Sequence, residues 1–191
     1  MASHFYAMLS RMKNIYRWGL MRNTKTENLS EHSFETAYVA HALGVIAKVR
    51  LGKTVEPEKI AVAALFHDAS EIITGDMPTP VKYDNPEIKA AYKKMEAAAE
   101  EKLFSMLPDD LRGEMVNSFA SGDAEIQKYV KAADKISALI KCIEELNMGN
   151  KEFAVAKESL KKAINELQME EADIFLDEFI DSFYLSIDEQ H

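Results

Sequence analysis

The chain has 191 residues, of which 47% are hydrophobic and 29% charged, and its formal net charge is −9. This length fits one domain, residues 1–191, with a buried core, and the negative charge argues against binding to nucleic-acid polymers. The longest apolar run, Ile60 to Phe66, has seven residues, whereas a bilayer span needs about 20, so we expect no membrane association. The N-terminus lacks a secretory core, and the lone Cys142 predicts a buried thiol in a cytoplasmic protein.

Residues 1–26 carry five basic side chains and no acid. They are Arg11, Lys13, Arg17, Arg22 and Lys25. This segment is either a basic surface helix of an acidic protein or a basic edge that receives a small anion. Charge alone favours the first interpretation.

The N-terminal half predicts three helices. Apolar residues at helical spacing predict the first over residues 5–17, and residues 18–29 form a loop. Ser30 is the expected N-cap of a second helix that continues to Val49. That helix is apolar on several faces, through residues such as Phe34, Tyr38 and Val45, so we expect it to be central and buried, with His41 as a satisfied core histidine.

A third helix is expected to begin at Pro57, carry His67 and Asp68, and end before Gly75. A loop over 75–85 precedes further helices that start with Asn85 as a cap. The expected ranges are 86–107, a weaker 109–119, a long helix that Gly122-Asp123 opens and that runs to Met148 before Gly149, then 152–167 and 170–182, followed by a frayed tail at 188–191. No alternating strand pattern or internal repeat occurs, so the sequence predicts a single-domain all-α bundle.

The doublet His67-Asp68 stands inside an otherwise apolar helical stretch, and His32 and Asp134 occupy similar positions on two other expected helices. Burying such groups is costly unless something compensates, and a bound metal ion is a common compensation. Two imidazoles and two carboxylates form a nitrogen and oxygen ligand set that suits manganese, iron, cobalt or zinc. For each residue alone the alternative is structural: a satisfied core histidine, or an aspartate paired with a buried arginine.

Glu71 lies four residues after His67 and three after Asp68, so on a continuous helix it shares their face. A carboxylate beside a metal site is where a general base or a water-orienting group would stand. Asp76, Pro78 and Thr79 form the loop just beyond, within reach of a ligand.

The order His32, His67-Asp68, Asp134 resembles the signature of the HD-domain phosphohydrolases. Residues 17–33 and 67–82, and the segment around Asp134, are similar to the bacterial HD-domain 5′-deoxynucleotidases over nearly the whole chain. The resemblance implies an all-α HD fold, a homodimer, and hydrolysis of deoxyribonucleoside 5′-monophosphates to deoxynucleoside and phosphate, with selection against ribonucleotides. Gly19 stands where proline is expected in this family, which predicts a looser loop after Trp18.

The resemblance also implies residue roles. One divalent transition metal ion, such as cobalt, manganese or zinc, would be held by His32, His67, Asp68 and Asp134. Arg17 would orient the phosphate, and Trp18 would pack near the sugar and disfavour a 2′-hydroxyl. The substrate would contact Arg17, Trp18, His32, Asp68, Asp76, Met77, Pro78, Thr79 and Asp134.

We expect metal-assisted hydrolysis, with Glu71 orienting or deprotonating the attacking water and Asp76 assisting the leaving alkoxide. These two assignments are interchangeable at this level. Two other functions stay open: a different HD phosphohydrolase activity, such as a phosphodiesterase or triphosphohydrolase, and a non-catalytic nucleotide sensor that uses the same pocket. Base preference and the native metal are not set by the sequence.

Overall fold

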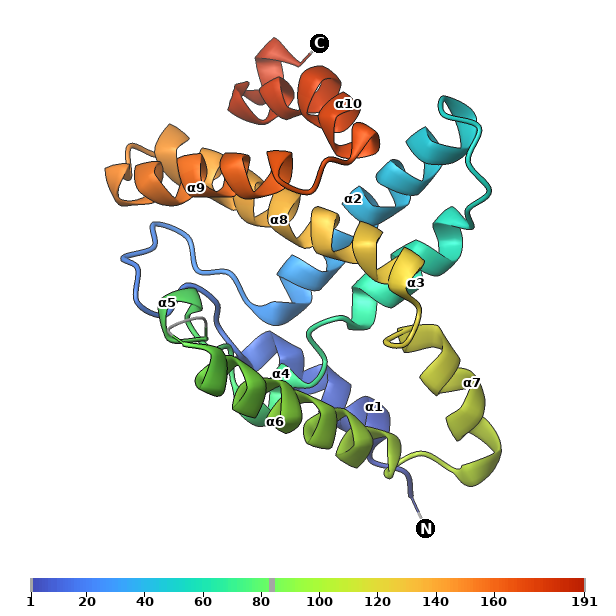
Figure 1. The fold of residues 1–191 in the computed structure, drawn as a ribbon. Helices are drawn as coiled ribbons and strands as arrows, with labels where there is room; N and C mark the ends of the chain where they lie inside the picture. Colours follow the sequence, from blue (N-terminus) through green and yellow to red (C-terminus); the bar gives the residue numbers. More distant parts are fainter. Residues whose placement is uncertain (1, 83–84, 191) are drawn as a thin grey trace.

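The computed structural model describes residues 2–82 and 85–190, except for the side chain of Thr79, and the prediction of an all-α bundle is confirmed (Figure 1). Within these residues the only β-type pairing is one antiparallel bridge between Tyr16 and Asn28. The α-helices are α1 (Phe5–Leu9), α2 (Leu29–Val49), α3 (Pro57–Phe66), α4 (Glu71–Thr74), α5 (Thr79–Lys82), α6 (Pro86–Phe104), α7 (Asp109–Phe119), α8 (Ala124–Asn147), α9 (Ala154–Asn165) and α10 (Glu170–Phe179). Short 3-10 helices are η1 (Ser10–Asn14), η2 (Lys151–Phe153), η3 (Ile180–Tyr184) and η4 (Ile187–Glu189). None of the described helices has the length and apolar character needed to cross a membrane.

The long helix α8 runs through the middle of the molecule and packs against α2 and α3 (Figure 1). Helices α9 and α10 lie on the side that holds the C-terminus, whereas α1, α4 and α6 lie on the side that holds the N-terminus. The main core joins α2, α3, α8 and α10 through fully buried side chains such as Leu43, Ile60, Ile136, Leu139 and Ile143. Cys142 on α8 is a buried free thiol, as the sequence predicts.

Helix ends follow local sequence signals. Asn85 caps α6 by accepting a hydrogen bond from the backbone N–H of Ile88, and Gly149 closes α8 with a left-handed φ of 84°, as predicted. The N-cap of α2 is Asn28 and not the expected Ser30, because the Asn28 side chain accepts from the N–H groups of Ser30 and Glu31. Glu31 completes a capping box by accepting from the Asn28 N–H.

The expectation of one continuous third helix is wrong. Helix α3 ends at Phe66, and His67 and Asp68 lie in a turn before α4 begins at Glu71. Nδ1 of His67 lies 2.7 Å from the carbonyl oxygen of Ala64, the group that would accept the Asp68 N–H in an uninterrupted helix. This side-chain hydrogen bond competes with the helical one and favours the turn.

Other expected boundaries also change. The first expected helix, over 5–17, is α1 continued by η1, which ends at Asn14 because Tyr16 pairs with Asn28 in the bridge. A short helix, α5, lies inside the expected loop over 75–85, of which residues 83–84 are outside the described part. The tail expected to be frayed forms η4, capped by Ser186, while His191 lies outside the described residues.

Helix α2 is not buried on all sides. Phe34 is 67% exposed, Tyr38 41% and Val45 38%, and His41 is exposed, so the prediction that these side chains belong to the core is wrong. The opposite face of α2 is fully buried through Val39, Ala40 and Leu43. An apolar stripe of α2 therefore faces outward.

Candidate active site

Three segments that are distant in the sequence bring the predicted ligand residues together. His32 comes from the first turn of α2, His67 and Asp68 from the turn after α3, and Asp134 from the middle of α8. Ligand atoms of His32, His67 and Asp68 all lie within 4.8 Å of one another. Oδ1 of Asp134 is 3.1 Å from Nε2 of His32 and 4.0 Å from Nε2 of His67, so it joins the same cluster.

The two imidazole rings present the same nitrogen to this cluster. Nδ1 of His67 is bound to the Ala64 carbonyl, and Nδ1 of His32 lies 3.1 Å from Oγ of Ser137. Nε2 of His67 lies 3.2 Å and Nε2 of His32 3.6 Å from Oδ2 of Asp68. Nε2 of His67 is buried and has no hydrogen-bond partner among the described residues.

Electrostatics favours a neutral imidazole at His32 and an ionised carboxylate at Asp134. Burial lowers the pKa of His32, and the nearby charge of Arg17 acts in the same direction. Burial alone would raise the pKa of Asp134, but its contacts with His32, His67 and Arg17 hold that pKa well below the usual range. Two imidazole nitrogens and two carboxylate groups converge, and a divalent cation fits this donor set.

Arg17 borders the cluster. Its Nη1 lies 3.1 Å from Oδ2 of Asp68 and its Nη2 3.9 Å from Oδ1 of Asp134, while its Nε donates to Oε2 of Glu27 at 3.1 Å. Burial would lower the pKa of Arg17, but these carboxylates raise it. Asp68 thus does both things that the sequence allowed: it pairs with a buried arginine, and it belongs to the cluster.

A cavity of about 550 Å³ opens beside Arg17 and Asp134. Its volume lies in the range of about 300–1,000 Å³ that is typical of small-molecule sites. Of the residues that the sequence assigns to the substrate, Arg17, Trp18, Asp76, Met77, Pro78 and Asp134 line it. The side chain of Thr79 is outside the described part of the chain. The opposite wall comes from α8 and α9 through Lys135, Ala138, Ala156, Ser159, Leu160 and Ala163.

Comparison with known proteins fits this geometry. The family model described as 5′-deoxynucleotidase YfbR-like matches residues 4–183. The chain belongs to this family. A 5′-deoxynucleotidase of Vibrio parahaemolyticus is 51% identical over 98% of this chain and 97% of its own length. The 5′-deoxynucleotidase YfbR of Salmonella paratyphi B is 49% identical over 98% of this chain and 95% of its own length.

Solved structures share the fold of this YfbR-like chain. An HD-domain phosphohydrolase from Listeria innocua superposes with a TM-score of 0.82 at 24% identity, covering 96% of this chain and 90% of that one. The HD phosphohydrolase DatZ of cyanophage S-2L, solved with dA and one catalytic Zn²⁺ ion, has a TM-score of 0.66 at 20% identity, covering 92% of this chain and 96% of that one. The predicted HD fold is thereby confirmed.

Glu71 and Asp76, the acidic residues expected to take part in proton transfer, lie near the cluster of this YfbR-like chain, since, besides burial, the charge of Asp68 acts to raise the pKa of both. Glu71 is 4% exposed, its Oε1 lies 3.8 Å from Nζ of Lys82, and its Oε2 has no hydrogen-bond partner among the described residues. Burial raises the pKa of Glu71 to about 9, and the charges of Asp68 and Asp76 act in the same direction. Burial also raises the pKa of Asp76. Both carboxyl groups therefore keep a proton to higher pH than exposed carboxyl groups do.

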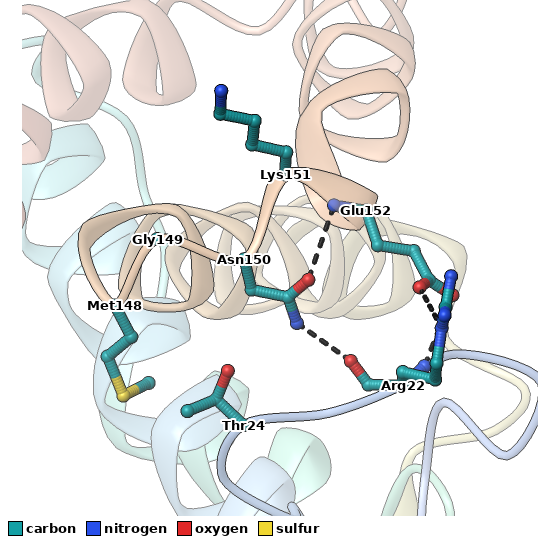
Figure 2. A pocket seen from close by; sticks show the side chains of 7 residues that line it. All are labelled: Arg22, Thr24, Met148, Gly149, Asn150, Lys151 and Glu152. Atoms are coloured by element: carbon teal, nitrogen blue, oxygen red, sulfur yellow. Dashed lines mark hydrogen bonds and ion pairs between the residues drawn. The ribbon is translucent and has the colours of Figure 1, made fainter.

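The loop that follows Trp18 is anchored rather than loose. Asn150 donates from Nδ2 to the Arg22 carbonyl at 2.7 Å, and Glu152 accepts from both the backbone and Nε of Arg22, beside the shallow pocket of about 650 Å³ drawn in Figure 2. Glu145, buried on α8, accepts from the backbone N–H groups of Thr24 and Lys25. These contacts fix the segment despite Gly19.

The backbone of Trp18 itself has a left-handed φ of 60°. For a residue other than glycine this conformation costs about 1–2 kcal/mol and persists only where neighbours impose it. Trp18 packs at 5.3 Å between ring centroids on Phe153 and lines the cavity.

Sequence reasoning missed several residues that hold this site. Ser137 and Glu35 support His32, Glu27 contacts Arg17, and Glu145 anchors the loop. For the residues on helices, the sequence signal that could have identified them is an acidic or hydroxyl group at a position that the helical pattern assigns to the interior. That signal is visible for Ser137 and Glu145 on α8, whereas Glu27 lies in a segment without periodicity.

Proposed function

We propose that this protein is a divalent-metal-dependent 5′-deoxynucleotidase that hydrolyses deoxyribonucleoside 5′-monophosphates to deoxynucleoside and inorganic phosphate. One observation carries the proposal: two imidazole nitrogens and two aspartates converge beside a guanidinium group at the edge of a 550 Å³ cavity. A phosphate monoester carries close to two negative charges, so its site needs a cation and a guanidinium group in an otherwise acidic protein. Relatives named 5′-deoxynucleotidase, about 50% identical over nearly the whole chain, support the substrate class.

His32, His67, Asp68 and Asp134 would hold the ion, since their ligand atoms face one another in the fold. When bound, a divalent ion in such a site polarises phosphoryl oxygen and makes a water molecule more acidic. The mixed nitrogen and oxygen set admits cobalt, manganese or zinc.

Arg17 would orient the phosphate, because its two terminal nitrogens already point at carboxylate oxygens of the cluster. Trp18 would pack against the sugar at C2′ and exclude a 2′-hydroxyl by steric conflict. Asp76, Met77, Pro78 and Thr79 would contact the substrate from the segment before α5. His32, Asp68 and Asp134 would contribute to both ion and phosphate binding.

Glu71 would orient or deprotonate the attacking water, and Asp76 would protonate the departing 5′-oxygen. The raised pKa of both carboxyl groups supports proton exchange by either, so the two roles can be exchanged. Residues 1–191 would act as one HD phosphohydrolase domain, and the buried thiol of Cys142 is in keeping with a cytoplasmic protein.

The decisive experiment measures product release from paired deoxyribo- and ribonucleotides after chelation and stepwise addition of single metals. We expect inorganic phosphate from deoxynucleoside monophosphates only when metal is added, and much slower release from ribonucleotides. Pyrophosphate or tripolyphosphate release from triphosphates would point to another HD phosphohydrolase. Tight nucleotide binding without turnover in any metal would point to a sensor.

We also propose that the protein forms a homodimer through the exposed apolar stripe of α2. Phe34, Tyr38, Val45 and Val49 are 67%, 41%, 38% and 74% exposed, and they recur on one side of this helix. Exposed apolar rows of this kind usually mark an interface. Analytical ultracentrifugation should show a dimer that Phe34→Ser dissociates, whereas Val155→Ser, at a 78% exposed position on α9, should not. A wild-type monomer at all concentrations would overturn this proposal.

A further inference from the structure

Glu27 is a buried acid that bonds to both side chains expected to recognise the substrate. It is 8% exposed. Its Oε2 accepts a hydrogen bond from Nε of Arg17 at 3.1 Å and another from Nε1 of Trp18 at 3.0 Å. One carboxylate oxygen therefore fixes the guanidinium and the indole relative to each other.

The backbone places Glu27 directly across from Arg17. The Arg17 N–H donates to the Glu27 carbonyl at 2.9 Å, and the Leu29 N–H donates to the Ile15 carbonyl at 2.9 Å. With the bridge between Tyr16 and Asn28, these bonds close the base of the loop 18–26. The Glu27 side chain extends across the base of this loop and reaches the side chains of Arg17 and Trp18 on the opposite side of the bridge.

The hydrogen bond to Nε leaves only the terminal nitrogens of Arg17 to face the cluster. Nη1 lies 3.1 Å from Asp68 and Nη2 3.9 Å from Asp134. A guanidinium tied at Nε cannot rotate freely, so its outer edge stays aimed at the place where a phosphate would bind.

The same carboxylate holds the indole of Trp18. The left-handed backbone at Trp18 directs the ring to the cavity, where it lies between the Glu27 contact and the Phe153 ring. An indole that excludes a 2′-hydroxyl must stay in place, because a ring that can move aside would admit ribose as well as deoxyribose.

We propose that Glu27 is the positioning residue that sets deoxyribose selectivity, by locking Trp18 and Arg17 in one mutual geometry. The inference rests on the proposed function, in which Arg17 binds the phosphate and Trp18 excludes the 2′-hydroxyl. Glu27 does not itself line the cavity, whereas Arg17 and Trp18, which it binds, both do, so its effect passes through these two side chains.

The test compares kcat/KM for a deoxyribonucleotide and its ribonucleotide partner in wild type and Glu27→Gln. The amide keeps the size of the side chain but loses the charge that attracts the guanidinium group, and its oxygen is a weaker acceptor for the two hydrogen bonds. We expect the deoxyribose preference to fall about tenfold, with a rise in KM from the loosened Arg17. Glu152→Gln is the matched control, because it releases the same loop at Arg22 without touching Arg17 or Trp18, and it should retain the preference.

A double-variant cycle separates positioning from general destabilisation. Trp18→Phe keeps an aromatic ring but lacks the N–H donor. If Glu27 acts through the indole, adding Glu27→Gln to Trp18→Phe should change the sugar preference little further. Full additivity of the two changes would overturn the proposal.

Trp18 is the only tryptophan in the chain, so its fluorescence reports on this contact without substrate or metal. We expect Glu27→Gln to increase acrylamide quenching and to lower emission anisotropy, while Glu152→Gln changes them less. A wild type that prefers deoxyribose, together with a Glu27→Gln variant of unchanged preference and fluorescence, would overturn this inference alone. A wild type that hydrolyses neither nucleotide would overturn the proposed function and the inference with it.

Discussion

The hydroxyl oxygen of Ser137 lies 3.1 Å from Nδ1 of His32, and it can only accept a hydrogen bond there. The single hydroxyl proton of Ser137 is donated to Oε2 of Glu35 at 2.8 Å. The other oxygen of Glu35 accepts from the Tyr38 hydroxyl at 2.7 Å. This arrangement favours the tautomer with the proton on Nδ1 of His32, which leaves Nε2 free to bind a cation.

Ser137→Ala should weaken metal binding by about 10- to 100-fold, because it removes the partner that sets the tautomer and the ring orientation of His32. Isothermal titration of the metal-free protein with Co²⁺ or Zn²⁺ measures this directly. Ser33→Ala is the control, since the buried Ser33 hydroxyl has no hydrogen-bond partner among the described residues and its loss should leave the affinity unchanged. Equal affinity of Ser137→Ala and wild type would remove Ser137 from the site.

Glu71→Gln should bind metal as wild type does but lose about 10²- to 10⁴-fold in kcat, since the buried carboxyl can no longer take up a proton. Steady-state phosphate release and metal titration on the same sample test the two halves of the expectation. Glu101→Gln, at an exposed position on α6, should change neither. Full turnover in Glu71→Gln would exclude Glu71 from the chemistry.

An aryl phosphate ester can assign the roles of Glu71 and Asp76. A phenolate with a low pKa leaves without protonation, so replacing the general acid costs little with this ester. We expect Asp76→Asn to regain activity on p-nitrophenyl phosphate relative to a deoxynucleotide, while Glu71→Gln stays slow on both. The reverse pattern would exchange the two assignments.

The sequence predicted the membership of the cluster better than its local geometry. His32, His67, Asp68 and Asp134 were identifiable because polar groups interrupt apolar helical patterns, and burial makes such interruptions costly. The break between α3 and α4 was not predictable, because it depends on the His67 side chain binding the Ala64 carbonyl. The outward face of α2 was also misassigned, since an apolar residue such as Phe34 has the same pattern in a core and on an exposed stripe.

The contacts of the loop over residues 18–27 could not be predicted from the sequence either. Glu27 lies in a segment with no periodicity, and its importance follows only from the bridge that sets it opposite Arg17. A buried acid on a regular helix, such as Glu145, can be recognised from the sequence because it interrupts the apolar pattern. The backbone N–H groups that it binds, at Thr24 and Lys25, cannot be recognised in this way.

Stability should depend on the ionisation of Glu145. Hydrogen bonds from Lys141, Thr24 and Asn150 overcome burial and lower its pKa to about 2, from an ordinary value near 4.5. A depressed folded-state pKa stabilises the fold above the unfolded value, and this contribution is lost as the pH falls from about 4.5 towards 2. Glu145→Gln should therefore be less stable than wild type by roughly 2 kcal/mol at pH 7, and the difference should shrink below pH 4.5. Urea unfolding at pH 7, 4 and 3 measures it, and a gap that does not change with pH would contradict the assignment.

Gly44 allows α2, which carries His32, to approach α3, which leads to His67. A Cβ at Gly44 would lie 2.9 Å from Cα of Pro57 and 3.2 Å from Cδ1 of Ile60. Gly44→Ala should therefore lower the free energy of unfolding by about 1–3 kcal/mol despite the better helix propensity of alanine. Gly113→Ala on α7 has open space around the new methyl group and should raise the free energy of unfolding by up to about 1 kcal/mol. Since α2 carries His32 and α3 leads to His67, we expect Gly44→Ala to weaken metal binding as well, and isothermal titration with Zn²⁺ measures this. A Gly44→Ala protein with wild-type stability and affinity would show that the two helices need not lie this close.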